Sequence, residues 1–163
     1  MLIYFLRHGD ASIDSHLRDN ERPLTELGVR QAACVGKFLR QSNTQVDVVL
    51  SSPLERAQAT ALLVHAHIDS PEPVSSEFLL NDSSHRQLLE QLNSLNISSA
   101  LLVGHAPHLS DTISFLLHGT FENGIEMKKC TLALVESPFP LRPGSGRLKQ
   151  LTHVGSLMKD EKH

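Results

Sequence analysis

The chain has 163 residues, of which 40% are hydrophobic and 20% charged, so it is long enough and apolar enough for one globular domain with a substantial core. Its formal net charge of −3 provides no overall positive field, and neither nucleic acid nor an anionic membrane surface is an expected partner. No apolar run approaches the roughly 20 residues of a membrane span, and the N-terminus lacks the basic start and long apolar stretch of a signal peptide, so neither is expected.

Apolar runs alternate with helical patterns along the first third of the chain, which predicts an α/β fold. Residues 2–6 form a continuous apolar run, as expected for a strand that is covered on both faces. Residues 25–40 place their apolar side chains on one face of a predicted helix, and residues 46–50 form a second buried strand. In "SSPLERAQATALLV", Ser52 is a candidate N-cap and Glu55 completes a capping box, which predicts that the next helix begins at Pro53.

The middle and end of the chain continue this alternation. A polar connector over residues 69–84 leads to a leucine-rich helix that Ser84 and Gln87 are placed to cap. Three more strands are predicted at residues 100–103, 131–135 and 148–154, with a helix from Pro107 to about Gly119 after the first of them and a Pro/Gly-rich turn over residues 137–146. We therefore expect a three-layer α/β/α sandwich with a mostly parallel central sheet and an antiparallel edge strand near the C-terminus. Residues 1–156 are expected to form the single domain, and residues 157–163 a flexible tail.

Strongly polar residues follow the three clearest strands. The first strand runs into Arg7 and His8, the second is followed by Arg56 one turn into the helix, and the third runs into His105. Parallel strands deliver their carboxyl ends to one edge of an α/β sheet, so we expect these four side chains to converge there. Arginine forks and helix N-termini bind phosphate, and a neutral histidine is a competent nucleophile, so the pattern predicts a phosphate site with phosphoryl-transfer chemistry. Taken singly, Arg56 could be an exposed arginine at a helix start, and His105 could simply bond to a backbone carbonyl.

Four segments resemble those of the histidine phosphatase superfamily, which has the phosphoglycerate-mutase-like fold. They are "RHG", "RPLTELGVRQA", "SSPLERAQAT" and "LLVGHAPHLS", and they occur in the family's order. The short chain, "RHGDA" and "RPLT" are most similar to the small SixA-type branch, the phosphohistidine phosphatases. The resemblance implies that His8 is the phosphorylated nucleophile, that Arg7 and Arg56 hold phosphate oxygens, and that His105 is a further phosphate ligand. It also places Arg22 at the edge of the pocket.

The proton donor to the leaving group is less clear. Larger family members place an acid after the helix that carries the second arginine, where this chain offers Glu77 and Asp82. Glu77 also fits a solvated loop charge, and Asp82 a helix cap. Asp10 is another candidate proton carrier. Because imidazole titrates near neutrality, a phosphohistidine substrate depends less on an acid than a phosphate ester does.

The cysteines and the other histidines give no metal signature. The two cysteines are far apart and form no CxxC, which suits a reducing cytoplasm. The close histidine pairs, His65 with His67 and His105 with His108, lack the acidic or cysteine partners of a closed zinc site. No metal or other cofactor is expected.

The preferred interpretation is a cytoplasmic phosphohistidine phosphatase that acts through a phosphorylated His8. Few residues separate the helix after Pro53 from the next one, which leaves little room for a lid over the site. The expected partner is a phosphohistidine-bearing protein, either a His-phosphotransfer domain or a phosphotransferase-system protein. Two alternatives stay open: a small-molecule phosphomonoesterase or phosphomutase of the same fold, and a phosphate-binding module without catalysis.

Overall fold

A single sheet organises the part of the chain that the computed structural model describes, residues 1–122 and 124–160, and its six strands lie in the order β3-β2-β4-β1-β5-β6. The strands are β1 (Leu2–Arg7), β2 (Val48–Ser51), β3 (Val74–Ser75), β4 (Ser99–Gly104), β5 (Leu132–Glu136) and β6 (Arg147–Thr152). The α-helices are α1 (Glu26–Gln41), α2 (Glu55–His65), α3 (His85–Ser94), α4 (His108–His118) and α5 (Val154–Asp160). Two short 3-10 helices, η1 (Asp19–Glu21) and η2 (Glu77–Leu79), lie in the connections.

The strand directions confirm a mostly parallel sheet with an antiparallel C-terminal edge. Strands β1, β2, β3 and β4 pair in parallel, whereas β5 is antiparallel to β1 and the edge strand β6 is antiparallel to β5. In register, Arg7 lies beside Gly104, and Ser51 lies beside Val103. The residues that follow β1, β2 and β4 therefore emerge side by side at one edge of the sheet.

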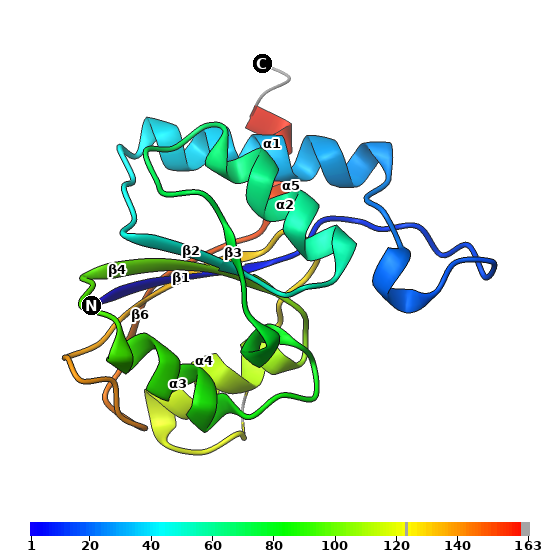
Figure 1. The fold of residues 1–163 in the computed structure, drawn as a ribbon. Coiled ribbons are helices and arrows are strands. Elements are labelled where there is room, and N and C mark those ends of the chain that lie inside the picture. Colours follow the sequence, from blue (N-terminus) through cyan, green and yellow to red (C-terminus); the bar gives the residue numbers. More distant parts are fainter. Residues whose placement is uncertain (123, 161–163) are drawn as a thin grey trace.

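Helices cover both faces of the sheet, which confirms the three layers. Helices α1, α2 and α5 lie on one face, and α3 and α4 lie on the other (Figure 1). Because side chains alternate along a strand, Phe5 of β1 packs into the core with α3 and α4, while Leu6 packs into the core with α1 and α2. Both side chains are fully buried. No helix in the described ranges is long and apolar enough to cross a membrane.

The helix after β2 begins later than the sequence predicts. Helix α2 starts at Glu55 with Leu54 as its N-cap residue, so the predicted N-cap at Ser52 and first position at Pro53 are wrong. The Ser52 hydroxyl instead accepts the Leu54 N–H at 3.3 Å and lies 2.7 Å from Nε2 of His105. The Ser52 side chain therefore binds His105 at the carboxyl edge of the sheet and does not cap α2.

Two other segments contain more regular structure than their sequences indicate. The polar connector over residues 69–84 contains β3 and η2, and β3 pairs with the end of β2. At the C-terminus, residues 157–160, expected to belong to a tail, continue helix α5, and Leu157 and Met158 pack against the core under α1. Residues 161–163 of the expected tail lie outside the described part of the chain.

Candidate active site

A cavity of about 310 Å³ lies at the carboxyl edge of the parallel strands. The structure brings five residues singled out from the sequence together in its wall: Arg7, His8, Arg22, Arg56 and His105. The other lining residues are Asp19, Leu54, Asn81, Ala106 and Lys129. The ten residues come from distant parts of the chain. Six meet because β1, β2 and β4 end side by side, and the other four, Asp19, Arg22, Asn81 and Lys129, reach the cavity from other connections.

His8 is held in one tautomer. Its ring is buried, and Nδ1 lies 2.7 Å from the carbonyl oxygen of Gly9. A carbonyl only accepts, so Nδ1 carries the proton and Nε2 keeps its lone pair for the cavity. Burial lowers the pKa of His8 to about 3; the bond to Gly9 opposes this, and the charges of Lys129, His105 and Arg56 reinforce it. At neutral pH the ring is therefore a neutral imidazole with an available nitrogen.

The backbone around His8 is fixed from several sides. The His8 N–H donates to the Gly104 carbonyl at 3.0 Å, and the Gly9 N–H donates to the Thr60 hydroxyl on α2, also at 3.0 Å. A Cβ at Gly9 would lie 2.7 Å from the carbonyl oxygen of Gly28 at the start of α1. Glycine follows the histidine because the backbones of the β1 end and of α1 approach each other too closely for any side chain.

His105 faces His8 across the site. The two ring centroids are 5.1 Å apart and the planes are inclined by 58°. Nε2 of His105 is hydrogen-bonded to the Ser52 hydroxyl, and burial, aided by the charge of Arg56, lowers the pKa of His105 to about 4. Both histidines are thus neutral and oriented by fixed partners.

Arg7, which lines the cavity, has one donor without a partner. Its Nη1 donates to the carbonyl of Met127 at 2.8 Å, which fixes the guanidinium. Its Nε is buried and finds no acceptor among residues 1–122 and 124–160. A buried donor without a partner costs free energy, and an anion in the cavity would satisfy it.

Asp19 holds the other two arginines of the cavity. Arg56 donates to the Asp19 carbonyl at 2.6 Å and to its carboxylate at 3.2 Å, while Arg22 contacts the other carboxylate oxygen at 3.0 Å. Burial alone would raise the pKa of Asp19, but the hydrogen bonds and charges of Arg56 and Arg22 outweigh it and lower that pKa. A carboxylate thus sits where the arginines could otherwise bind phosphate.

The three acids considered from the sequence do not line this cavity. Glu77 and Asp82 are exposed, on η2 and in the loop after it. Asp10 accepts the Thr25 hydroxyl at 2.7 Å at the start of α1. Asn81, next to Asp82, lines the cavity instead, and its Oδ1 accepts the N–H of His108 at the start of α4.

Sequence reasoning did not find Asp19, Asn81 or Lys129. Asp19 begins η1 in a polar segment without hydrophobic periodicity, and Lys129 precedes β5 in "MKKC", where it has the same identity as its neighbour Lys128. Only the fold shows that these three residues lie beside those of "RHG" and "SSPLERA". The sequence carried no signal for these three positions.

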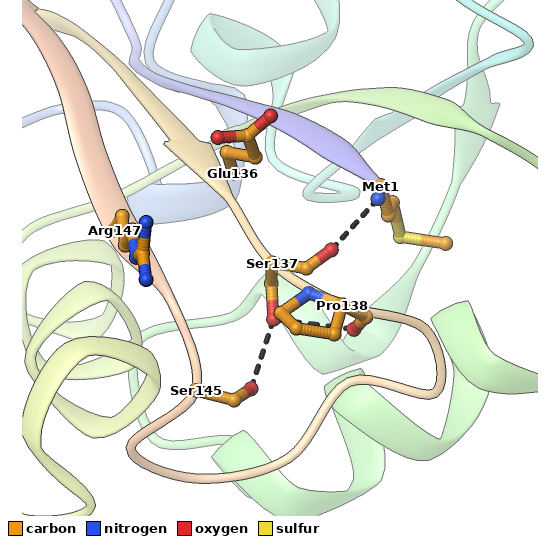
Figure 2. Close-up of a pocket in the computed structure, with 6 residues that line it drawn as sticks. All are labelled: Met1, Glu136, Ser137, Pro138, Ser145 and Arg147. Atoms are coloured by element: carbon orange, nitrogen blue, oxygen red, sulfur yellow. Dashed lines mark hydrogen bonds between the residues drawn. The ribbon is translucent and has the colours of Figure 1, made fainter.

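A second cavity, of about 340 Å³, lies near the amino end of β1 and is lined by Met1, Glu136, Ser137, Pro138, Ser145 and Arg147 (Figure 2). Its polar groups already bind each other. The Met1 ammonium donates to the Ser137 carbonyl at 2.7 Å, and the Ser137 and Ser145 hydroxyls are 2.9 Å apart. It gathers neither the histidines nor the several cations of the first cavity.

The fold and the first cavity together define an α/β protein that gathers several cationic side chains around a neutral histidine. The family model described as histidine phosphatase superfamily (branch 1) matches residues 3–85, half of the chain, and the chain therefore belongs to that superfamily.

The chain is also similar to individual members of known sequence or structure, among them two relatives and one solved structure. It is 29% identical over 125 residues to the phosphohistidine phosphatase SixA of Escherichia coli, a match that covers 73% of this chain and 76% of that protein. It is 33% identical over 107 residues to an uncharacterized protein of Mycobacterium tuberculosis, covering 64% of this chain and only 65% of that relative. A structure of the protein histidine phosphatase SixA complexed with tungstate superposes with a TM-score of 0.87 at 24% identity, covering 96% of this chain and 99% of that one. Family membership and the similarity to SixA indicate a hydrolase of the phosphatase class.

Proposed function

We propose that the chain hydrolyses phosphohistidine on a partner protein and that His8 is the covalent nucleophile. The observation that carries the proposal is the tautomer of His8. With Nδ1–H bound to the Gly9 carbonyl, Nε2 is the nitrogen left for a phosphoryl group, in a cavity that also holds Arg7, Arg56 and His105.

In the first step Nε2 of His8 attacks the phosphorus atom of the substrate. A new P–N bond forms, the P–N bond of the substrate breaks, and its electron pair stays on the departing nitrogen. A substrate ring protonated on its other nitrogen leaves as neutral imidazole. Phosphorylated His8 then carries a positive ring, and the Gly9 carbonyl stabilises its Nδ1–H.

In the second step a water molecule attacks the phosphorus atom of the phosphoenzyme. The P–N bond to His8 breaks, its electron pair returns to Nε2, and the protons of the water leave with phosphate and solvent. His8 returns to its neutral tautomer because Nδ1 keeps its proton throughout. The arginines stabilise the charge of the phosphoryl group in both steps, which phosphoryl transfer requires above all.

The lack of a free acid favours phosphohistidine over a phosphate ester. Among the residues that the structure describes, Asp19 is the one carboxylate that lines the cavity. Arg56 and Arg22 hold it ionised by lowering its pKa. An alkoxide leaves poorly without a proton, whereas imidazole leaves readily. The phosphohistidine phosphatase SixA among the relatives supports the same choice.

The surroundings of the cavity favour a protein substrate. Between α2 and α3 the chain forms only β3 and η2, so this connection contributes no lid. We take the partner to be a His-phosphotransfer domain or a phosphotransferase-system protein, encountered in the cytoplasm, where Cys34 and Cys130, which form no disulfide, stay reduced.

Intact-mass spectrometry after a rapid quench without acid tests the proposal. The wild-type protein, mixed with a phosphohistidine-bearing domain, should gain the mass of one phosphoryl group and release phosphate. The His8→Ala variant should do neither, whereas His118→Ala, which changes an exposed histidine at the end of α4, should behave as wild type. Faster hydrolysis of p-nitrophenyl phosphate than of phosphohistidine would instead identify a small-molecule phosphatase. Tungstate binding without turnover of either substrate would identify a binding module.

A further inference from the structure

Residues 127–131, which precede β5, are hydrogen-bonded directly to Arg7 at the end of β1 and to His8, which follows it. Arg7 donates from its side chain to the Met127 carbonyl and from its backbone to the Thr131 carbonyl, at 2.8 and 3.2 Å. The Cys130 N–H donates to the His8 carbonyl at 3.2 Å. Lys129 lies between these points, so its position is set by the arginine and the histidine of the cavity.

Lys128 and Lys129 lie together in a tight turn that ends at Thr131. Cys130 has φ 50°, in the left-handed region, and the Thr131 N–H donates to the Lys128 carbonyl at 2.9 Å. Lys128 points to solvent, with its side chain 66% exposed and 3.9 Å from Glu126. Lys129 is half-buried and lines the cavity. Two identical residues in sequence thus have opposite surroundings.

The ammonium of Lys129 faces other cations. Within residues 1–122 and 124–160 no carboxylate lies close enough to form an ion pair with it. Burial lowers the pKa of Lys129, Arg7, Arg22 and Arg56 lower it further, and only the charge of Asp10 acts against them. A lysine held among arginines without its own anion is unfavourable in the empty cavity, and a bound dianion would reverse that cost.

We propose that Lys129 is a further catalytic residue, whose ammonium donates to the oxygens of the bound phosphoryl group and completes the positive enclosure formed by Arg7 and Arg56. The inference rests on the proposed function of the same site. Lys129 stays protonated and transfers no proton, so the bonds made and broken are those already given for His8. Its part is to neutralise charge as the phosphoryl group passes between nitrogens.

Lys129 also acts on His8 in the empty site. The charges that act on the His8 ring are those of Lys129, His105 and Arg56, and among them that of Lys129 lowers the pKa of His8 most, after burial itself. Removing the ammonium should therefore make His8 easier to protonate. A residue that only supported the loop would not have this effect.

Three variants separate the roles of the two lysines. Lys129→Met removes the charge and keeps the apolar stem, Lys129→Arg restores a cation, and Lys128→Met is the matched control on the solvent side. The first measurement is the affinity for inorganic phosphate and tungstate by titration calorimetry, which needs no turnover. We expect Lys129→Met to lose about 10- to 100-fold, the range of one charge-assisted hydrogen bond. Lys129→Arg should regain most of this loss, and Lys128→Met should stay within about twofold of wild type, as expected for an exposed charge.

The second measurement follows His8 by NMR as the pH is lowered. Protonation of His8 should begin at a higher pH in Lys129→Met than in wild type, and Lys128→Met should coincide with wild type. Equal phosphate affinity and an unchanged His8 titration in Lys129→Met would overturn the inference, as would a wild-type protein that binds no phosphate. If Lys129→Met does not fold, Lys129→Gln replaces it in both experiments.

These outcomes are distinct from failure of the proposed function. Phosphate binding by the wild type with no turnover of any substrate would refute the phosphatase. The comparison of Lys129→Met with Lys128→Met would still decide whether Lys129 contacts the anion.

Discussion

Replacing Asp19 by asparagine should make the site bind phosphate more tightly. The substitution removes the charge that Arg56 and Arg22 share, at 3.2 and 3.0 Å, and leaves intact the hydrogen bond from Arg56 to the Asp19 carbonyl. A phosphoryl dianion that binds these arginines competes with this carboxylate in the wild type. In the variant it meets arginines that have lost their internal anion.

The gain is modest because the carboxylate is well hydrated. The Asp19 side chain is 66% exposed, although those of Arg56 and Arg22 are only 8% and 24% exposed, and ion pairs open to solvent contribute roughly 0.2–1 kcal/mol each. Two such pairs together give about 1 kcal/mol, which corresponds to about a fivefold tighter Kd for inorganic phosphate or tungstate. The difference should shrink as salt is added, since solvent ions screen exposed charges.

Titration calorimetry with tungstate at low and high salt measures this effect. Asp14→Asn is the matched control, because Asp14 is exposed in the same loop and does not line the cavity. Weaker tungstate binding by Asp19→Asn would refute the reasoning. It would mean that Asp19 orients Arg56 for the anion rather than competing with it.

Two further predictions concern stability. Gly9→Ala places a Cβ 2.7 Å from the Gly28 carbonyl oxygen, so thermal unfolding followed by circular dichroism should show a free energy of unfolding lower by about 1–3 kcal/mol. Gly155→Ala, whose Cβ meets nothing within 4 Å, should show no such loss. Equal melting of the two variants would contradict the backbone contact. His8 has a pKa of about 3 and His105 of about 4 in the folded chain, against about 6.5 when unfolded, so the unfolded state binds more protons below pH 6.5. Stability in urea should therefore be complete above about pH 6.5 and fall steadily as the pH drops towards 4, and a flat profile across that window would show that these rings are not buried in neutral form.

Much of the fold follows from local pattern. The strands β1 and β4 are continuous apolar runs because both their faces are covered, and their ends carry Arg7, His8 and His105 at one edge as parallel pairing requires. Ser84 caps α3 and Gly119 ends α4 in the left-handed conformation, both as local rules predict.

Other features depend on tertiary contacts that no local pattern reports. Both residues of β3 are exposed, and it is a strand only because it pairs with β2. Ser52 has the spacing of an N-cap, but a buried histidine partner takes its hydroxyl. Helix α5 contains Gly155, a poor helix former, and forms where Leu157 reaches the core. Lys129 lies beside the cavity because of the turn that contains Cys130. The left-handed backbone of Cys130 could not be predicted, because the residue at that position is not glycine.

A short series of buried bonds connects the proposed nucleophile to one of the arginines. Nδ1 of His8 binds the Gly9 carbonyl, the Gly9 N–H binds the Thr60 hydroxyl, and that hydroxyl donates to the Arg56 carbonyl one turn earlier on α2, at 2.7 Å. Tilting α2 against the sheet would therefore pull on the bond between Thr60 and Gly9, next to His8. The position of the Arg56 backbone relative to the His8 ring is set inside the protein, before a substrate arrives, and separating the two would break interior bonds that water cannot readily replace.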